Sequence, residues 1–317
     1  MPKGKQPVNR PSFPYLVLVI GVLIASTASI MITGALALGI SPLTIAAGRV
    51  VLASLILTPL AWGRAGPALR QVTRRDLWLA LAAGACLAAH FATWISSLAY
   101  TSVASSTALV TTNPVFVALA TWLIYRERLS LGSWVGVLLT VGGSLLIALS
   151  DSNGNSGATA PLLGDGLALL GALAVSGYFL LGRQLRTRLS LLPYIWLVYT
   201  ATAIGLLGIM ALAGQSLLGL PPMGYVLILG LALGPQLLGH TAFNWAIKYL
   251  SPTLVTVAIL GEPLGSTALA LVIFHQPLQP LQLLGGAVLL GGIAVATLAE
   301  RHAAAPTAPL EVKGELA

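Results

Sequence analysis

Long apolar stretches, separated by short polar or charged segments, follow one another along almost the whole chain. A helix that crosses the hydrocarbon core of a bilayer needs about 17–25 predominantly apolar residues. The sequence contains ten such runs, bounded by charged residues, Pro or Gly: 15–38, 42–62, 77–98, 101–124, 132–150, 162–183, 192–213, 223–247, 251–274 and 280–299. The pattern predicts an all-α integral membrane protein with ten transmembrane helices.

Composition favours lipid over water as the surrounding of this chain. Of its 317 residues, 57% are hydrophobic and 8% are charged, whereas soluble domains carry about 25% charged residues. Helices satisfy their own backbone groups, which an apolar solvent demands. The single cysteine, Cys86, lies inside an apolar run, so we expect neither disulfides nor a thiol metal site. No phosphate-binding, dinucleotide-binding, zinc-hydrolase or serine-hydrolase motif occurs, and we expect no cofactor, no metal and no catalytic residues.

The basic residues indicate how the ten runs are oriented. All but one of the cations fall on the same side of a ten-span chain: Lys3, Lys5, Arg10, Arg64, Arg70, Arg74, Arg75, Arg126, Arg128, Arg183, Arg186, Arg188, Lys248, Arg301 and Lys313. The opposite loops hold Asp151 and Asp165 but no Lys or Arg. The positive-inside rule then places both termini in the cytoplasm of a multi-pass protein of the cell (inner) membrane. The net charge of +8 therefore reflects topology, and we expect no nucleic-acid partner.

The chain also contains an internal repeat. When it is shifted by 149 residues without gaps, Tyr100 meets Tyr249, Pro114 meets Pro263, and the pair Gly142-Gly143 meets Gly291-Gly292. An odd number of spans per copy makes the second copy enter the membrane from the other side, so we expect two inverted five-helix repeats. The expected organisation is a first repeat at 1–150, an outer linker at 151–161, a second repeat at 162–300 and a disordered cytoplasmic tail at 301–317.

The repeated segments resemble the drug/metabolite transporter superfamily, of the EamA type. The resemblance rests on LAYTSVASSTALVTTNPVFVALATWLIYRERLS with GSWVGVLLTVGGSLLIAL in the first copy, and on IKYLSPTLVTVAILGEPLGSTALALVIF with GGAVLLGGIAVATL in the second. Arg49, in SPLTIAAGRVVLAS, is similar to an arginine in the second helix of that family. The resemblance implies a ten-helix transporter, and similar proteins export amino acids and other small metabolites. One departure is Gln276, which stands where the first copy has Glu127.

Glu262 is the sharpest candidate for function. It lies about 12 residues, or roughly 17 Å, into its predicted helix, close to the middle of the bilayer. A carboxylate at that depth is costly and usually faces a cavity, which suits a proton-coupling site. Pro263 follows it, and the equivalent pair in the first copy is Asn113-Pro114, so both copies carry a polar residue at a proline helix break. The alternative is a structural hydrogen bond from Glu262 to a neighbouring helix.

Further candidates lie inside other predicted helices. Arg49 could bind a substrate carboxylate, pair with Glu262, or only bond helix-end carbonyls. His90 and Trp94 share a helix face and could line a cavity for an aromatic or cationic substrate, or only pack. Weaker candidates for lining the same cavity are Tyr178, His240 and Asn244.

These features predict a secondary transporter, and an exporter by family resemblance, that moves small amphiphilic metabolites by alternating access. Proton antiport and facilitated diffusion both fit, so the expected partners are a small-molecule substrate, the lipid bilayer and, with antiport, protons. A non-transporting receptor or scaffold and an intramembrane enzyme are the alternatives. An enzyme would need clustered catalytic side chains that the sequence does not supply, so we do not expect enzymatic activity. Monomer and homodimer stay open.

Overall fold

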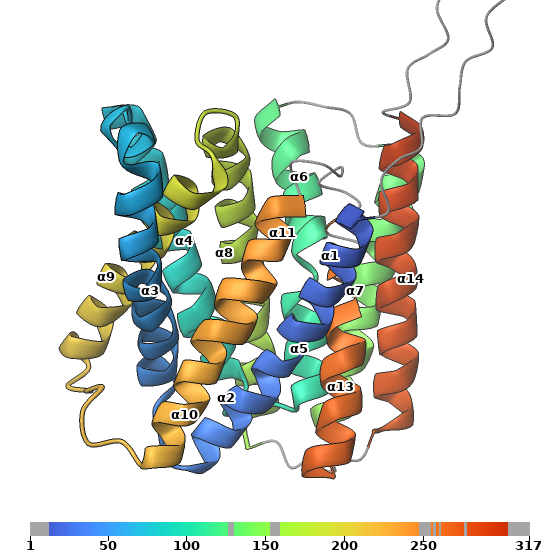
Figure 1. Ribbon diagram of the computed structural model, residues 1–317. Coiled ribbons are helices and arrows are strands. Elements are labelled where there is room, and N and C mark those ends of the chain that lie inside the picture. Colours follow the sequence, from blue (N-terminus) through green and yellow to red (C-terminus); the bar gives the residue numbers. More distant parts are fainter. Residues whose placement is uncertain are drawn as a thin grey trace, which may run out of the picture.

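The computed structural model describes residues 13–125, 130–152, 159–246, 255, 258–259, 261–275 and 278–303. Within these ranges the regular secondary structure is entirely helical, and the helices run up and down through one bundle (Figure 1). Glu127, Gln276 and most of the expected linker and tail lie outside the described residues.

All ten apolar runs contain helix. The first half holds α1 Phe13–Ala25, α2 Thr27–Ala37, α3 Pro42–Arg70, α4 Arg74–Ser97, α5 Val103–Val110, α6 Asn113–Tyr125 and α7 Leu131–Ser152. The second half holds α8 Pro161–Arg186, α9 Leu191–Leu212, α10 Pro222–Leu231, the π-helix η1 Ala232–His240, α11 Thr241–Ala246, α13 Gly261–Phe274 and α14 Pro280–Ala303. Among the described residues, six helical segments are long and apolar enough to cross a membrane, and four further apolar helices are shorter.

The helices of the two halves begin at equivalent positions in the chain. The first half starts helices at Phe13, Pro42, Arg74 and Leu131, and the second half starts helices 148 or 149 positions later, at Pro161, Leu191, Pro222 and Pro280. The shift of 149 residues found in the sequence therefore relates the helices of the first half to those of the second, as well as their residues. The architecture consists of two repeats.

The contact between α7 and α14 shows how the repeats are related. These helices pair at one edge of the bundle, where a Cβ added to Gly136 would lie 2.6 Å from the Gly292 carbonyl oxygen, and one added to Gly143 would lie 2.7 Å from the Gly285 carbonyl oxygen (Figure 1). Gly136 lies next to Gly292 and Gly143 next to Gly285, so the chain direction of α14 is opposite to that of α7 and the two helices are antiparallel. The shift of 149 residues relates Gly136 to Gly285 and Gly143 to Gly292, so it converts each of these contacts into the other. The pair is thus symmetric under exchange of the repeats, as expected for inverted copies.

Several helices differ in extent from the apolar runs. The helix predicted at 42–62 continues to Arg70, so Arg64 and Arg70 lie on α3 rather than in the loop where they were expected, and Arg183 and Arg186 likewise lie on α8. Helical hydrogen bonds continue beyond the end of the apolar run. A helix located only by its apolar residues therefore lacks its polar last turns. The loop between α3 and α4 is correspondingly short, and Thr73 and Asp76 close it with a reciprocal capping box.

Three predicted helices are interrupted. Ser26 separates α1 from α2, and Thr111-Thr112 separates α5 from α6, just before Asn113-Pro114. Pro114 has no N–H to donate, and in a continuous helix its ring would clash with the carbonyl of Val110 four residues earlier, which accounts for the second interruption. The third irregular helix is the one predicted at 223–247, which changes from α-helix to the π-helix η1 around Pro235. The missing N–H of this proline prevents a regular α-helical turn. Such irregular turns gather at functional sites in helical proteins.

Candidate functional site

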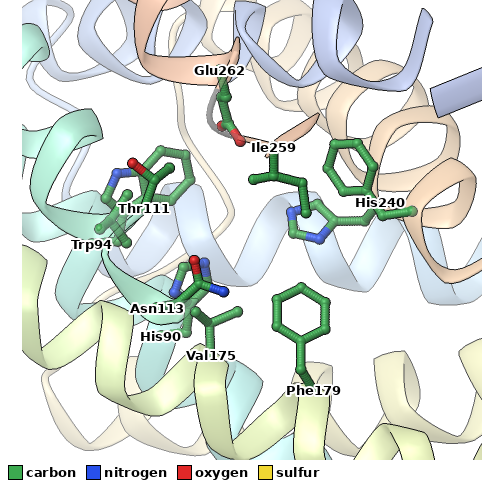
Figure 2. Close-up of a pocket in the computed structure, with 11 residues that line it drawn as sticks. His90, Trp94, Thr111, Asn113, Val175, Phe179, His240, Ile259 and Glu262 are labelled. Carbon is green, nitrogen blue, oxygen red and sulfur yellow. The ribbon is translucent and has the colours of Figure 1, made fainter. Parts of the chain in front are cut away.

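A cavity lies at the centre of the bundle, between the two repeats. Side chains from α4, α5, α6, α8, η1, α11 and α13 surround it (Figure 2). It is narrow in this structure, with a cavity volume of about 40 Å³. The lining residues are His90, Trp94, Val110, Thr111, Asn113, Val175, Phe179, His240, Phe243, Ile259 and Glu262.

The lining of this cavity follows the internal repeat. Three pairs of lining residues are related by the shift of 149: Trp94 with Phe243, Val110 with Ile259, and Asn113 with Glu262. A fourth related pair, Phe91 and His240, meets edge to face with ring centroids 5.7 Å apart. Equivalent residues can surround one space only if that space lies on the axis that relates the copies. The cavity therefore occupies the pseudo-two-fold axis, which is where transporters built from inverted repeats hold their substrate.

Glu262 reaches the cavity from the first turn of α13. Its carboxyl group points into the space between Thr111 and Ile259 (Figure 2). The carboxyl group forms no hydrogen bond or ion pair with the described residues, and residues 247–254, 256–257 and 260, which come just before it, lie outside them. Only its backbone carbonyl is engaged, by the Ser26 hydroxyl at 3.4 Å. The junction of α1 and α2 therefore meets the start of α13, and the ionisable carboxyl group of Glu262 faces the cavity.

His90 and Trp94 form one wall. The two rings are stacked, with centroids 5.7 Å apart and an angle of 15° between their planes. His90 Nδ1 lies 2.9 Å from the Gly171 carbonyl oxygen, which fixes the ring against α8. If Nδ1 donates to that carbonyl, His90 Nε2 is free to accept. Trp94 Nε1 is buried and has no hydrogen-bond partner in the described residues.

Asn113 lies where α6 begins, next to Pro114. Its carbonyl oxygen accepts a hydrogen bond from the Ser176 hydroxyl of α8 at 3.0 Å, while its side-chain Nδ2 is buried without a partner. Pro114 and Pro263 follow the two equivalent lining residues, and each occupies the first turn of its helix. Both prolines therefore position a polar side chain at the cavity.

Arg49 lies beside this cavity on α3, and its side chain is fully buried. The guanidinium carbon is 4.4 Å from the centre of the Phe91 ring. Phe91 in turn contacts His90 and His240, both of which line the cavity. The guanidinium nitrogens have no hydrogen-bond partner among the described residues, and Arg49 and Glu262 form no ion pair. The structure thus brings Arg49 close to the site without placing it in the lining.

Tyr178 and Asn244 are brought together away from the cavity lining. The Asn244 amide nitrogen donates to the Tyr178 hydroxyl at 2.9 Å, and that hydroxyl lies 3.1 Å from the Asn244 amide oxygen. Their neighbours Phe179 and Phe243 reach the cavity instead. His240 lines the cavity as expected from the sequence.

Sequence reasoning missed the apolar part of the site. Val110, Val175, Phe179, Phe243 and Ile259 line the cavity, as does Thr111, but none of them was selected from the sequence. Two signals could have found some of them. Val175 and Phe179 are four residues apart, as His90 and Trp94 are, and Phe243 is the repeat equivalent of the candidate Trp94.

Known proteins with similar sequences are transporters by name. The Bacillus subtilis (strain 168) protein "Uncharacterized transporter YdfC" is 26% identical over 189 residues, which cover 58% of this chain and 59% of that relative. The Synechocystis protein "Uncharacterized transporter sll1319" is 23% identical over 230 residues, or 71% of this chain and 68% of the relative. A solved crystal structure superposes with a TM-score of 0.64 over 92% of this chain and 99% of its own, at 20% identity, which shows a shared fold.

The sequence profile of the EamA-like transporter family matches this chain twice, at residues 12–149 and 162–298. The two matches take up most of the chain and fall on its two repeats. With its apolar helices, this identifies a multi-pass membrane protein of a transporter family. The chain belongs to the EamA-like transporter family.

Proposed function

We propose that this protein is a secondary transporter that exports small amphiphilic metabolites such as amino acids, and that Glu262 carries a proton in exchange. The observation that supports it most is the cavity on the axis between the repeats, where equivalent residues of both copies face each other. Rocking one repeat against the other about that axis opens the same space to either side of the membrane.

The lining of the cavity fits an amphiphile. Trp94, Phe179 and Phe243 offer aromatic surface to an apolar group, while Asn113, His90 and Glu262 offer polar atoms. Small-molecule sites commonly combine an apolar wall with a few polar groups that fix orientation. Glu262 is the one carboxyl group among the described lining residues, and we assign to it the uptake of a proton on one side and its release on the other.

We propose the orientation from the basic residues: both termini in the cytoplasm of the inner membrane, with the linker outside. A reporter fused after Ser156 should then be found outside, and one fused after Arg186 inside. Two reporters on the same side would contradict this topology.

Flux in proteoliposomes tests the proposed function. The full chain is reconstituted and screened with labelled amino acids, with and without a pH gradient. The wild type should accumulate a substrate when the gradient is applied. Glu262→Gln keeps the shape and removes the titrating group, so this variant should still exchange substrate across the membrane but lose gradient-driven accumulation.

A matched control is Asp76→Asn, which also changes a carboxylate to its amide. Asp76 lies in the first turn of α4, paired with Arg188 at 3.2 Å, and is not part of the cavity. It should keep gradient-driven transport at equal protein levels. Undiminished accumulation by Glu262→Gln would rule out proton coupling through this residue. Downhill flux without accumulation in the wild type would indicate facilitated diffusion, and no flux of any compound would favour a receptor or scaffold.

A further inference from the structure

A second, larger cavity lies between α5, α7, α13 and α14. Its volume is about 430 Å³, compared with about 40 Å³ for the central cavity. The helix α13 borders both spaces, because Glu262 lines the central cavity and the next two residues, Pro263 and Leu264, line the second one. The helices α13 and α14, which contribute most of its wall, stand at one edge of the bundle (Figure 1).

The lining of this second cavity is almost entirely apolar. Thr267 and Gln282 are the two polar side chains among its described lining residues. The Gln282 amide nitrogen already donates to the hydroxyl oxygens of Ser102, at 3.2 Å, and Ser105, at 3.5 Å. A space with such a lining does not hold ordered water and offers nothing to a charged group, so its occupant must be apolar.

The cavity is open to the outer surface of the bundle. The lining leucines Leu264, Leu271 and Leu283 are 60%, 44% and 57% exposed, so they also form its rim. All three belong to the apolar runs that span the membrane, where the surface of a helix is surrounded by lipid hydrocarbon. The cavity is therefore accessible from the lipid.

The equivalent helices of the first repeat are bridged by two indole rings. The shift of 149 residues relates Leu271 to Trp122 and Leu283 to Trp134. Trp122 of α6 and Trp134 of α7 pack edge to face, with ring centroids 5.5 Å apart and an angle of 78° between their planes. The second repeat has two leucines in place of this pair, and the space between α13 and α14 is left open.

Two further lining positions are smaller in the second repeat. Gly286 is equivalent to Val137, and Ala268 is equivalent to Leu119. A Cβ on Gly286 would meet nothing within 4 Å, whereas one on the neighbouring Gly285 would lie 2.9 Å from the Gly143 carbonyl oxygen. Close helix packing therefore explains Gly285 but not Gly286. The small residue at 286 enlarges the cavity instead.

We propose that one acyl chain of a membrane phospholipid occupies this cavity, in the place that the two indole rings take in the first repeat. An empty apolar cavity costs free energy in proportion to its volume. A volume of about 430 Å³ is nearly three times the about 150 Å³ that holds a benzene molecule, so it has room for a stretch of hydrocarbon chain. A helix from a second copy is about 10–12 Å wide with its side chains, which does not suit a recess between two helices of one repeat. This inference rests on the membrane location of the chain and does not depend on the role assigned to Glu262.

Photolabelling of the wild type in proteoliposomes tests whether the chain enters. The probe is phosphatidylcholine with a diazirine in one acyl chain, and the labelled residues are mapped by mass spectrometry. Ile147 and Leu289 line the cavity and are only 2% and 0% exposed, so bulk lipid does not reach them. We expect adducts on at least one of these two residues. Adducts confined to exposed residues such as Leu145 would overturn the proposal.

Thermal stability tests which part of the lipid is bound. The full chain is stripped of lipid in glyco-diosgenin, whose rigid steroid cannot replace an acyl chain, and is then titrated with dioleoylphosphatidylglycerol or dioleoylphosphatidylcholine. A ligand of the folded state raises the apparent Tm, and both lipids should raise it by a similar amount, roughly 5 °C. The compound sn-glycerol 3-phosphate, which lacks acyl chains, should not. Stabilisation by one headgroup only, an equal effect of glycerol 3-phosphate, or no effect of either lipid would overturn the proposal.

Variants locate the effect. Leu271→Trp with Leu283→Trp introduces the residues of the first repeat, so it should raise the Tm without lipid and weaken the apparent lipid affinity at least tenfold. Val272→Trp with Leu284→Trp, at the adjacent exposed positions outside the lining, is the control and should respond to lipid like the wild type. Gly286→Val alone should fold, since its Cβ meets no neighbour, and should weaken the response several-fold.

The control variant also separates a lipid site from an interface between two copies. Unchanged lipid affinity in both Leu271→Trp with Leu283→Trp and Gly286→Val would place any bound lipid elsewhere and overturn the proposal. A lipid-free dimer that Leu271→Trp with Leu283→Trp dissociates, and that the control leaves intact, would assign the cavity to a second copy and overturn it as well.

Discussion

Asn113 and Glu262 occupy equivalent positions in the two repeats, and both side chains line the same cavity. Each is followed by a proline in the first turn of its helix, α6 or α13. The two copies therefore present one polar residue each to a common space, but only the second copy presents a carboxyl group. The carboxyl group to which we assign proton coupling therefore belongs to the second repeat alone among these two equivalent positions.

The equivalence predicts that the carboxyl group can be moved from one repeat to the other. Glu262→Asn should abolish transport driven by a pH gradient, and adding Asn113→Glu should restore part of it, because the new carboxylate faces the same cavity. The measurement is gradient-driven accumulation in proteoliposomes at matched protein levels. The control adds Asn113→Gln instead, which should restore nothing. A double variant that exchanges substrate yet never accumulates it would contradict a shared site.

A second prediction concerns the stacked pair of His90 and Trp94. Trp94→Ala removes the ring that lies parallel to His90 and deprives an apolar substrate group of its wall. Aromatic stacking contributes about 0.5–1.5 kcal/mol beyond the loss of buried area, so the apparent KM for flux should rise roughly tenfold. Trp78→Ala is the matched control, since Trp78 is on the same helix but 72% exposed. Equal kinetics for the two variants would count against a substrate-facing Trp94.

The third prediction concerns the pairing of α7 with α14. A Cβ on Gly143 would lie 2.5 Å from the Leu289 backbone nitrogen, whereas one on Gly142 meets nothing within 4 Å. Gly143→Ala should therefore destabilise the protein by about 1–3 kcal/mol, and Gly142→Ala should stay within about 0.5 kcal/mol of the wild type. Apparent Tm values in detergent measure the difference. Equal values would mean that the two helices do not approach as closely as described here.

Much of this architecture could be predicted from the sequence, because lipid imposes a length on every spanning helix. The apolar runs located the helices, and the shift of 149 residues identified the equivalence of Asn113 with Glu262. The same property concealed how each helix is rotated. A helix between lipid and protein is apolar on all sides, so it lacks the polar face that would orient it. For this reason Tyr178 was selected from the sequence, although its neighbour Phe179 lines the cavity.

The irregular backbone was equally hard to foresee. Pro235 suggested no particular geometry, yet the chain around it forms the π-helix that carries Gln236 and His240. Gln236 is an ordinary polar residue in the sequence. It stands out only when its side chain is found fully buried, and when Leu87 is found at the equivalent position of the other repeat.

If the cavity on the axis opens to each side of the membrane in turn, a thiol placed in it should be accessible from both sides. Cys86 is the one native cysteine, so Cys86→Ala provides a background without thiols, and Val175→Cys then places a single thiol in the cavity. Val198→Cys, buried outside the cavity lining, is the control. We expect a membrane-impermeant methanethiosulfonate reagent to modify Val175→Cys from either side of oriented proteoliposomes and to leave Val198→Cys unmodified. Modification of Val175→Cys from one side only, or from neither, would contradict alternating access through this cavity.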